Sequence, residues 1–274
     1  MVAARSSTRV RMPPNESTDQ AIIGLANVTK TFVTPSGPIT VLSDITLELK
    51  RGRMLCIVGP SGCGKTTILN LISGFLTPTS GTVKINGRPI KGPGPDRAVV
   101  FQRDSVFPWL TVRQNLEYGP KVRGIPRRQW APRIEEYLEK VGLQHCANHY
   151  PKQLSGGMRK RVDIARAYAN NPEILLMDEP FGSLDVMTKE LMQKDLLELS
   201  YKEQKSLIFI THDIEEAVFL GDEVLVMTRR PPNIKRRIEV PFSKPRDISV
   251  KLEPEFQALR KEIDAILKEK ESHA

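Results

Sequence analysis

The fold of this chain is decided by the stretch Gly59-Pro60-Ser61-Gly62-Cys63-Gly64-Lys65-Thr66-Thr67. An apolar run at 54–58 precedes it and a helix-like segment at 66–74 follows, as the phosphate-loop pattern G-x-x-x-x-G-K-[ST] requires. Its three glycines permit a tight turn whose N–H groups point into one concavity, and the positive end of the helix dipole faces the same place. The stretch therefore predicts an anion nest, in which Lys65 reaches the β- and γ-phosphates of a nucleotide and Thr66 becomes a ligand of Mg²⁺. The alternative is a glycine-rich turn that merely ends a strand.

The bulk composition sets limits without deciding the function. The 274 residues include 41 basic and 32 acidic ones, and a net charge of +9 would suit nucleic acid, an anionic membrane surface or a phosphorylated ligand. Three cysteines without paired spacing indicate a reducing compartment, and Cys63 is expected to be a packing residue. Every apolar run is far shorter than the ~20 residues that cross a bilayer, so no membrane span is expected. Residues 1–20 are polar, without an apolar signal segment, and predict a disordered arm.

Residues 21–50 read as antiparallel strands joined by a turn at 35–38. Ile45, Leu47 and Leu49 alternate with polar residues, which is typical of a half-buried strand. Phe32 is the only aromatic residue before the phosphate loop. If this segment lies beside the nucleotide, the Phe32 ring is the one available to stack on adenine; otherwise it is a strand residue packed in the core.

Polar residues follow three further apolar strands, at ends where ligand contacts gather in open α/β sheets. Gln102 ends the strand at 97–102 and could be a ligand of Mg²⁺ and a sensor for attacking water, or a plain strand-terminating residue. Asp178 and Glu179 end the buried run at 173–177. Because such a placement of two carboxylates is costly without a cation, Asp178 is expected to orient Mg²⁺ and Glu179 to polarise the attacking water. His212 follows the strand at 206–210 and could contact the γ-phosphate, although a lone histidine is more often structural.

The region at about 103–165 has helical periodicity and no β-rich run, and predicts a helical subdomain inserted into the sheet domain. Its apolar stretch at 105–110 is either subdomain core or part of a groove that docks a partner. Ser155, Gly156 and Gly157 precede a helix and predict an N-terminal cap with exposed amides, which is a second anion site. Because one nucleotide cannot easily occupy both sites of one chain, two protomers are expected, each closing over the phosphate loop of the other.

Taken in order, these motifs resemble the nucleotide-binding subunit of an ATP-binding-cassette (ABC) transporter. The resemblance covers residues from about 22 to 240, and Ser155-Gly156-Gly157 before a helix is its most specific part. It implies an α/β fold of the P-loop NTPase (RecA-like) type, with a mixed sheet core, an antiparallel β subdomain and the inserted helical subdomain. The ATPase domain would span 21–250 and be followed by a C-terminal amphipathic helix at 251–274.

The resemblance also implies a ligand and the residues that bind it. ATP and Mg²⁺ would be the bound pair, with Phe32 stacked on adenine. Lys65, Thr66 and Thr67 would hold phosphates and Mg²⁺, within a cradle formed by the whole loop 59–67. Asp178 would anchor the magnesium ion.

Catalytic and dimer roles are implied for a further set of residues. Glu179 would be the general base, His212 the γ-phosphate switch and Gln102 the coupling-loop residue that also contacts Mg²⁺. The segment Ser155-Gly156-Gly157 would clamp the phosphate across a dimer, and Asp185, at the turn into a helix at 186–202, would make a cross-dimer contact. Phe32 stands where Tyr is usual, so the ring can still stack but the hydroxyl is lost.

Three features are similar to the importer group for nitrate, sulfonates and taurine: Met158 in place of Gln, the run at 107–110 and the basic turn at 229–233. The partners implied are a transmembrane permease, a second ATPase subunit and, indirectly, a solute-binding protein outside the membrane. The implied location is the cytoplasmic face of the plasma membrane. Two alternatives are a soluble ABC ATPase acting on nucleic acid or ribosomes, which only the positive charge favours, and a small-molecule kinase, which would lack residues 154–158. No nucleic-acid partner is expected.

Overall fold

The computed structural model describes residues 21–182, 184–229 and 232–269. The expected arm at 1–20, the end of the C-terminal segment at 270–274, and part of the expected turn at 229–233 lie outside these residues, as does Ser183.

A six-stranded mixed sheet forms the centre of the molecule, in the order β10-β9-β3-β8-β7-β6. Its strands are β3 (Met54–Val58), β6 (Arg97–Val100), β7 (Ile174–Asp178), β8 (Ser206–Ile210), β9 (Glu223–Arg229) and β10 (Pro232–Glu239). All neighbours pair in parallel except β10, which is antiparallel to β9. This sheet confirms the mixed core expected from the sequence.

Both faces of the core sheet are covered, which is why its central strands are mostly apolar. Successive residues of β3 enter different clusters, with Met54, Cys56 and Val58 on one face and Leu55 and Ile57 on the other. This alternation follows from the period of two along a strand. Helices that follow β6, β7 and β8 cover the first face, while α1 (Lys65–Ser73) and a second sheet cover the other.

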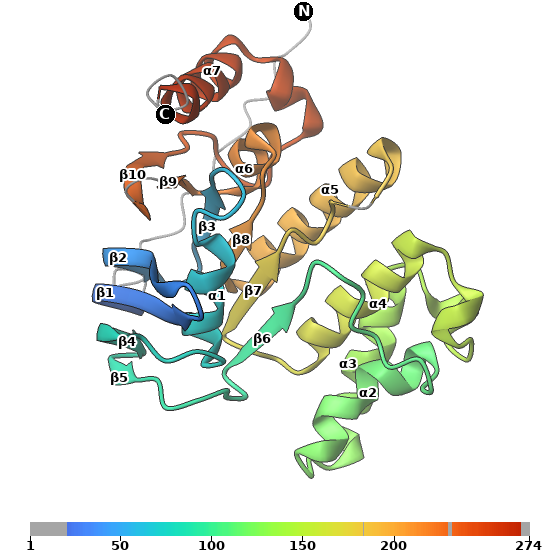
Figure 1. The fold of residues 1–274 in the computed structure, drawn as a ribbon. Coiled ribbons are helices and arrows are strands. Elements are labelled where there is room, and N and C mark those ends of the chain that lie inside the picture. The colour runs from blue at the N-terminus through green and yellow to red at the C-terminus, as the bar shows by residue number, and fades with distance from the viewer. Residues whose placement is uncertain (1–20, 183, 230–231, 270–274) are drawn as a thin grey trace, which may run out of the picture.

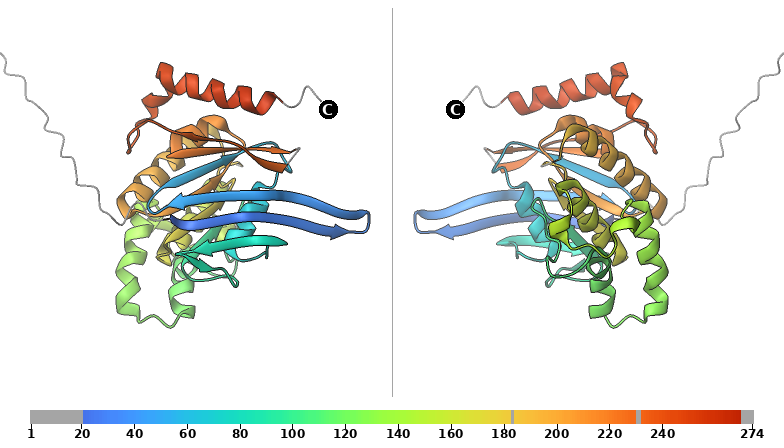
Figure 2. Two further views of the ribbon diagram at one scale, coloured as in Figure 1. Left: turned by 90° about the vertical axis from the view of Figure 1, so that its left-hand side faces the viewer. Right: turned by 90° about the vertical axis from the view of Figure 1, so that its right-hand side faces the viewer.

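The second sheet is antiparallel, in the order β2-β1-β4-β5. Its strands are β1 (Ala21–Thr34), β2 (Gly37–Lys50), β4 (Ser80–Ile85) and β5 (Arg88–Pro89). The sequence indicated separate runs at 22–28 and 31–33, but β1 is continuous, and shifts in its pairing absorb the polar residues between them. Asn27, with φ of 49°, lies at such a shift. Figure 2 shows the β1–β2 hairpin projecting beyond the rest of the fold.

Three helices pack on one another beside the core sheet: α2 (Val112–Val122), α3 (Arg127–Lys140) and α4 (Gly156–Ala169). They form the lobe at the side of the molecule away from the antiparallel sheet (Figure 1). Two 3₁₀ turns, η2 (Gln144–Cys146) and η3 (Pro151–Gln153), connect α3 to α4. The helical region was expected to end near residue 165, whereas α4 continues to Ala169. Its last turn is buried, and the helix packs on β6 as well as on α2 and α3.

The last part of the described chain comprises α5 (Val186–Glu203), α6 (Ile214–Leu220), η4 (Ile248–Leu252) and α7 (Pro254–Lys268). Helix α7 buries Phe256, Ile263 and Ile266 and packs against α6 and β9. Its opposite face is charged, as the amphipathic pattern predicted. Among the described residues, no helix has the length and apolar character needed to cross a bilayer.

Candidate functional site

The residues expected to act together lie at one edge of the core sheet because they follow neighbouring parallel strands. Ile210 of β8 is in register with Ile57 of β3 and with Asp178 of β7, and Val100 of β6 is in register with Met177. The carboxyl ends of four strands therefore meet at this edge, where ligands bind in open α/β sheets.

The phosphate loop requires glycine at three positions, for two different reasons. Gly62 and Gly64 have φ values of 78° and 100°, a backbone conformation that L side chains rarely adopt. Gly59 needs space instead, since a Cβ there would lie 2.7 Å from the Cys63 Sγ and 2.8 Å from the Met227 carbonyl oxygen. The loop leads directly into α1, which begins at Lys65.

Lys65 is buried and folds back over the loop. Its Nζ donates to the carbonyl oxygens of Gly59 at 2.7 Å and Pro60 at 3.2 Å. The Cys63 amide also donates to Pro60, at 3.3 Å, while burial raises the pKa of the Cys63 thiol, as befits a packing residue. The ammonium group is thus held at the mouth of the loop, next to the place where a phosphate would bind.

Asp178 and Thr66 face each other across this mouth. The Thr66 hydroxyl donates to Asp178 Oδ2 at 3.0 Å. Burial raises the pKa of Asp178, and the charge of Glu179 adds to the rise, against the opposing effects of Thr66 and Lys65. A carboxylate that burial destabilises, paired with a hydroxyl, is a donor set that fits Mg²⁺. No group of three or more His, Cys, Asp or Glu side chains in the described ranges could hold a metal alone, so bound Mg²⁺ would also depend on nucleotide phosphates.

Side chains from two other strand ends contact Glu179. Its Oε2 accepts from Gln102 Nε2 at 3.3 Å and lies 3.0 Å from His212 Nδ1. Its backbone N–H donates to the Ile210 carbonyl at 2.9 Å, and its φ of 44° is unusual for a residue with a side chain. The Glu179 side chain is 20 % exposed and that of His212 67 %. The cluster therefore presents one carboxylate to the space beside the phosphate loop.

The Ser155 and Asp185 segments lie elsewhere, as caps of two neighbouring helices. The Ser155 hydroxyl accepts from the Met158 amide at 3.3 Å and begins α4, while Asp185 accepts from the Thr188 amide at 3.0 Å and begins α5. A Cβ on Gly157 would lie 3.0 Å from Thr188 Cγ2, so the two helix starts are adjacent. In the part of the chain that the structure describes, none of the hydrogen bonds of Ser155 or Asp185 reaches the phosphate loop.

Comparison with known proteins identifies the family. The sequence model of a family described as ABC transporter matches residues 42–182. The chain is 43% identical to the nitrate import ATP-binding protein NrtD of Synechocystis sp. over 254 residues, which are 90% of this chain and 96% of that protein. The chain belongs to the ABC transporter family.

Other relatives agree with this assignment. The taurine import ATP-binding protein TauB of Jannaschia sp. is 40% identical over 246 residues, 88% of this chain and 92% of that protein. The dimeric structure of the ATP-binding cassette MJ0796 in a post-hydrolysis state, bound to ADP and Pi, superposes with a TM-score of 0.70 at 33% identity, covering 81% of this chain and 100% of that one. This chain is accordingly an ABC ATPase that binds ATP, and its resemblance to the nitrate and taurine import group is confirmed. The nucleic-acid alternative is not favoured.

Phe32 of this ABC ATPase lies on the hairpin that borders the phosphate loop. It is half-buried, pairs with Ile39 in register, and has the Lys30 ammonium 5.1 Å from its ring centroid. On the same hairpin, Leu42 packs where a Cβ of Gly64 would be, which brings β2 against the loop. Adenine stacking by Phe32 therefore stays a prediction, with the ring on the element that the prediction requires.

One neighbour of the ABC cluster was missed from the sequence. Asp213 directly follows His212, and its Oδ1 caps α6 by accepting from the amides of Glu215 at 3.0 Å and Glu216 at 3.3 Å. Its Oδ2 accepts from Lys189 Nζ on α5 at 2.6 Å. The sequence feature that could have revealed this cap is Glu216 three residues after Asp213, which is the spacing of a capping box.

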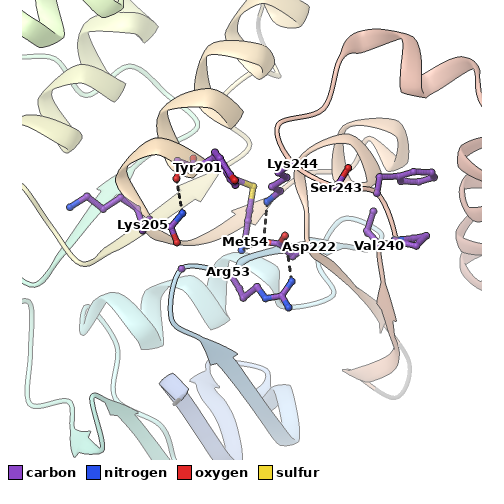
Figure 3. Close-up of a pocket in the computed structure, with 13 residues that line it drawn as sticks. Arg53, Met54, Tyr201, Lys205, Asp222, Val240, Ser243 and Lys244 are labelled. Atoms are coloured by element: carbon purple, nitrogen blue, oxygen red, sulfur yellow. Dashed lines mark hydrogen bonds and ion pairs between the residues drawn. The ribbon is translucent and has the colours of Figure 1, made fainter. Parts of the chain in front are cut away.

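A separate pocket of about 410 Å³ lies at the opposite edge of the ABC core sheet, by the amino ends of β3, β8 and β9 (Figure 3). Its charged groups already have partners. Asp222 Oδ2 accepts from Lys244 Nζ at 2.9 Å and from the Met54 amide at 2.7 Å, and its Oδ1 lies 3.7 Å from Arg53. Lys205 donates to a side chain outside the pocket. We assign this pocket no part in the ATPase site.

Proposed function

We propose that this ABC ATPase is the motor subunit of an importer for a small anion of the nitrate, sulfonate or taurine type. Two copies would bind Mg-ATP head to tail, close, hydrolyse it and reopen, driving a separate membrane permease. The observation that carries the ATPase part is the Glu179 carboxylate, which is held by Gln102 and His212 and lies next to Asp178. The importer part is supported by the names of the nitrate and taurine relatives.

In this proposal, the residues of the loop bind and orient ATP. Lys65 leaves the carbonyl groups of Gly59 and Pro60 for the β- and γ-phosphates, and the loop amides surround them. Thr66 and Asp178 would hold Mg²⁺, with Gln102 as a further ligand. The ion, when bound, supplies charge neutralisation for the phosphates.

Glu179 is proposed as the general base. Its Oε2 takes a proton from the attacking water as the water oxygen bonds to the γ-phosphorus and the bond to the bridging oxygen of ADP breaks. His212 orients Glu179 in the structure described here and would donate a hydrogen bond to the γ-phosphate when ATP is bound. Gln102 donates to the same carboxylate oxygen that His212 contacts.

The second copy is proposed because the two halves of an ATP site, the phosphate loop and the start of α4, lie at separate places in one chain. Ser155, Gly156 and Gly157 lie at the start of α4, where backbone amides have no acceptor within the helix, and Asp185 caps the adjacent start of α5. The corresponding segments of a partner would close over ATP bound at the phosphate loop. The dimeric structure of MJ0796 with ADP and Pi supports this arrangement.

The permease is proposed to dock on the aromatic group formed by Phe107, Trp109 and Tyr118. Trp109 is 68% exposed, and the Phe107 ring centroid lies 5.4 Å from that of Trp109 and 4.6 Å from that of Tyr118. Exposed aromatic rings at one place are typical of a protein-binding surface. We propose attachment at the cytoplasmic face of the plasma membrane through this contact, with an external solute-binding protein acting on the permease and no nucleic-acid partner.

Glu179→Gln tests the catalytic part. Turnover should fall by about 10²- to 10⁴-fold, the usual contribution of a general base, while the affinity for Mg-ATP is retained. Glu173→Gln is a matched control, because Glu173 is a surface partner of Arg51. Unchanged turnover in Glu179→Gln would refute the assignment.

The transport part needs the permease. Co-purification of this chain with a membrane subunit, followed by measurement of ATPase activity with nitrate, taurine or a sulfonate outside, should show stimulation by one of these anions. Trp109→Ala should lose the co-purification while keeping the basal ATPase activity. Stimulation by none of the three anions would refute the proposed solute class.

A further inference from the structure

The segment 101–111 connects the end of β6 to the start of α2 without helix or strand. It carries Gln102 at one end and, at the other, Phe107 and Trp109 of the proposed docking group; the third member of that group, Tyr118, lies on α2. Side chains of two helices make hydrogen bonds to its backbone. At its far end, buried Asn115 of α2 accepts from the Phe107 amide at 2.8 Å and donates to the carbonyls of Phe107, Leu110 and Thr111 at 3.2, 3.1 and 2.9 Å. The docking end is thereby fixed to α2.

At the near end, a lysine of α4 makes the corresponding contacts. Lys160 has a side chain that is 1% exposed, and its Nζ donates to the carbonyl oxygens of Phe101 at 3.0 Å and Gln102 at 3.3 Å. Carboxylate oxygens of Asp104 and Asp163 each lie 3.7 Å away. A buried ammonium group is costly unless it is surrounded in this way, so the side chain has little freedom to leave.

The middle of the segment is bound to the same face of α4. Arg166 donates to the Ser105 carbonyl at 2.7 Å and to Asp163 Oδ1 at 2.7 Å, and its guanidinium carbon lies 4.9 Å from the Phe107 ring centroid. Asp163 Oδ2 is buried, has no hydrogen-bond partner among the residues that the structure describes, and faces Lys160. The acid therefore joins the two cations into one buried network.

From this geometry we propose that Lys160 is a positioning residue for ATP hydrolysis, which fixes Gln102 relative to the start of α4. The inference rests on the proposed function, because it uses Gln102 as a holder of Glu179. Helix α4 begins at Ser155, the proposed clamp for the partner's ATP. Lys160, one and a half turns later, binds the backbone of the residue that contacts the general base. A displacement of the Ser155 clamp, or of the aromatic group proposed to dock the permease, would thus displace Gln102 and, through it, Glu179.

Two variants test this role. Lys160→Met removes the donors to Phe101 and Gln102. The double variant Lys160→Met with Asp163→Asn also removes the buried negative charge that faces Lys160, while the Asn oxygen can still accept from Arg166. Lys152→Met is the control, since Lys152 is an exposed lysine of the same lobe. We expect kcat to fall by roughly 10- to 100-fold in both test variants, as a displaced catalytic group causes. The affinity for Mg-ATP should change by less than about twofold, because Lys160 does not line the phosphate loop.

Hydrogen exchange separates positioning from a general loss of structure. Amides of residues 101–106 should exchange faster in both variants, whereas those of β3 keep the rates of the wild type. Wild-type kcat in the double variant would overturn the proposal. So would exchange of the β3 amides that is accelerated as much as that of residues 101–106. If Glu179→Gln is inactive while both Lys160 variants are fully active, only this inference fails. If Glu179→Gln is fully active, the proposed function fails as well.

Discussion

The cap at Asp213 offers a quantitative test of how the fold holds the His212 end of the site. Asp213→Ala removes both the cap of α6 and the acceptor for Lys189, whereas Asp213→Asn keeps an oxygen for the cap and loses the charge. The two variants therefore separate the backbone contact from the ion pair. Both leave His212 itself unchanged.

The expected losses follow from these contacts. An N-cap contributes about 1 kcal/mol to the free energy of unfolding. A hydrogen bond to a charged group contributes roughly 1.5–3 kcal/mol when it is buried. Because the side chains of Asp213 and Lys189 are 37% and 23% exposed, solvent screening reduces their pair to about 1 kcal/mol. We expect Asp213→Ala to lose about 2 kcal/mol and Asp213→Asn about 1 kcal/mol.

The pH dependence gives the sign of the charge effect. Burial alone would raise the pKa of Asp213, but the hydrogen bond and charge of Lys189, with the amides of Glu216 and Glu215, lower it below its usual range. The unfolded state then binds more protons than the folded state between the folded pKa and the unfolded value of about 3.9. The stabilisation is therefore fully present above about pH 4 and is lost as the pH falls through the folded pKa.

Urea unfolding of the nucleotide-free protein measures these quantities. The difference in the free energy of unfolding between the wild type and Asp213→Asn should be constant from pH 8 to pH 5 and should shrink below about pH 4. A loss of equal size in the Asn and Ala variants would refute the separation into cap and charge. A difference that grows as the pH falls would refute the assigned sign.

Three further predictions concern the loop, the core and the thiols. Lys65→Ala should weaken ATP binding by roughly tenfold or more, since a charge-assisted phosphate contact is lost, and native affinity in an equilibrium titration would contradict the loop assignment. Arg246→Met should lower the free energy of unfolding by about 3 kcal/mol, because buried Arg246 donates to four backbone carbonyls that would be left without partners; denaturant unfolding with a loss below about 1 kcal/mol would contradict this. Burial raises the pKa of Cys56, Cys63 and Cys146, so a thiol reagent at pH 8 should label them only as fast as the protein unfolds.

Local patterns in the sequence were sufficient for much of the fold. The apolar run before Gly59 became a fully buried β3, the alternation of Ile45, Leu47 and Leu49 became the half-buried β2, and Ser155 became a helix cap. These features depend on neighbours in the sequence, or on a strand or helix period, which a pattern shows directly. The convergence of Gln102, Asp178, Glu179 and His212 followed from the rule that strand ends meet at one edge.

Features that depend on distant contacts were not predictable in the same way. Lys160 and Asp163 are charged residues of a helix, for which exposure is the usual expectation, yet both are buried. Lys160 donates to carbonyls of the segment 101–105, and Asp163 accepts from Arg166 and from the Ser105 hydroxyl. Glu179 has a left-handed backbone conformation, which glutamate seldom adopts, so the residue type gives no indication of it. The continuity of β1 through Asn27 depends on pairing with two other strands, which the polar residues alone do not indicate.

The central claim is that ATP is bound between the phosphate loop of one chain and the Ser155 cap of another. Sedimentation of Glu179→Gln with and without Mg-ATP tests it most directly, with Ser155→Arg added as a variant that blocks the cap. We expect ATP-dependent dimers of Glu179→Gln that disappear when Ser155→Arg is added. A Mg-ATP complex of Glu179→Gln that binds nucleotide yet stays monomeric at every protein concentration would contradict the claim.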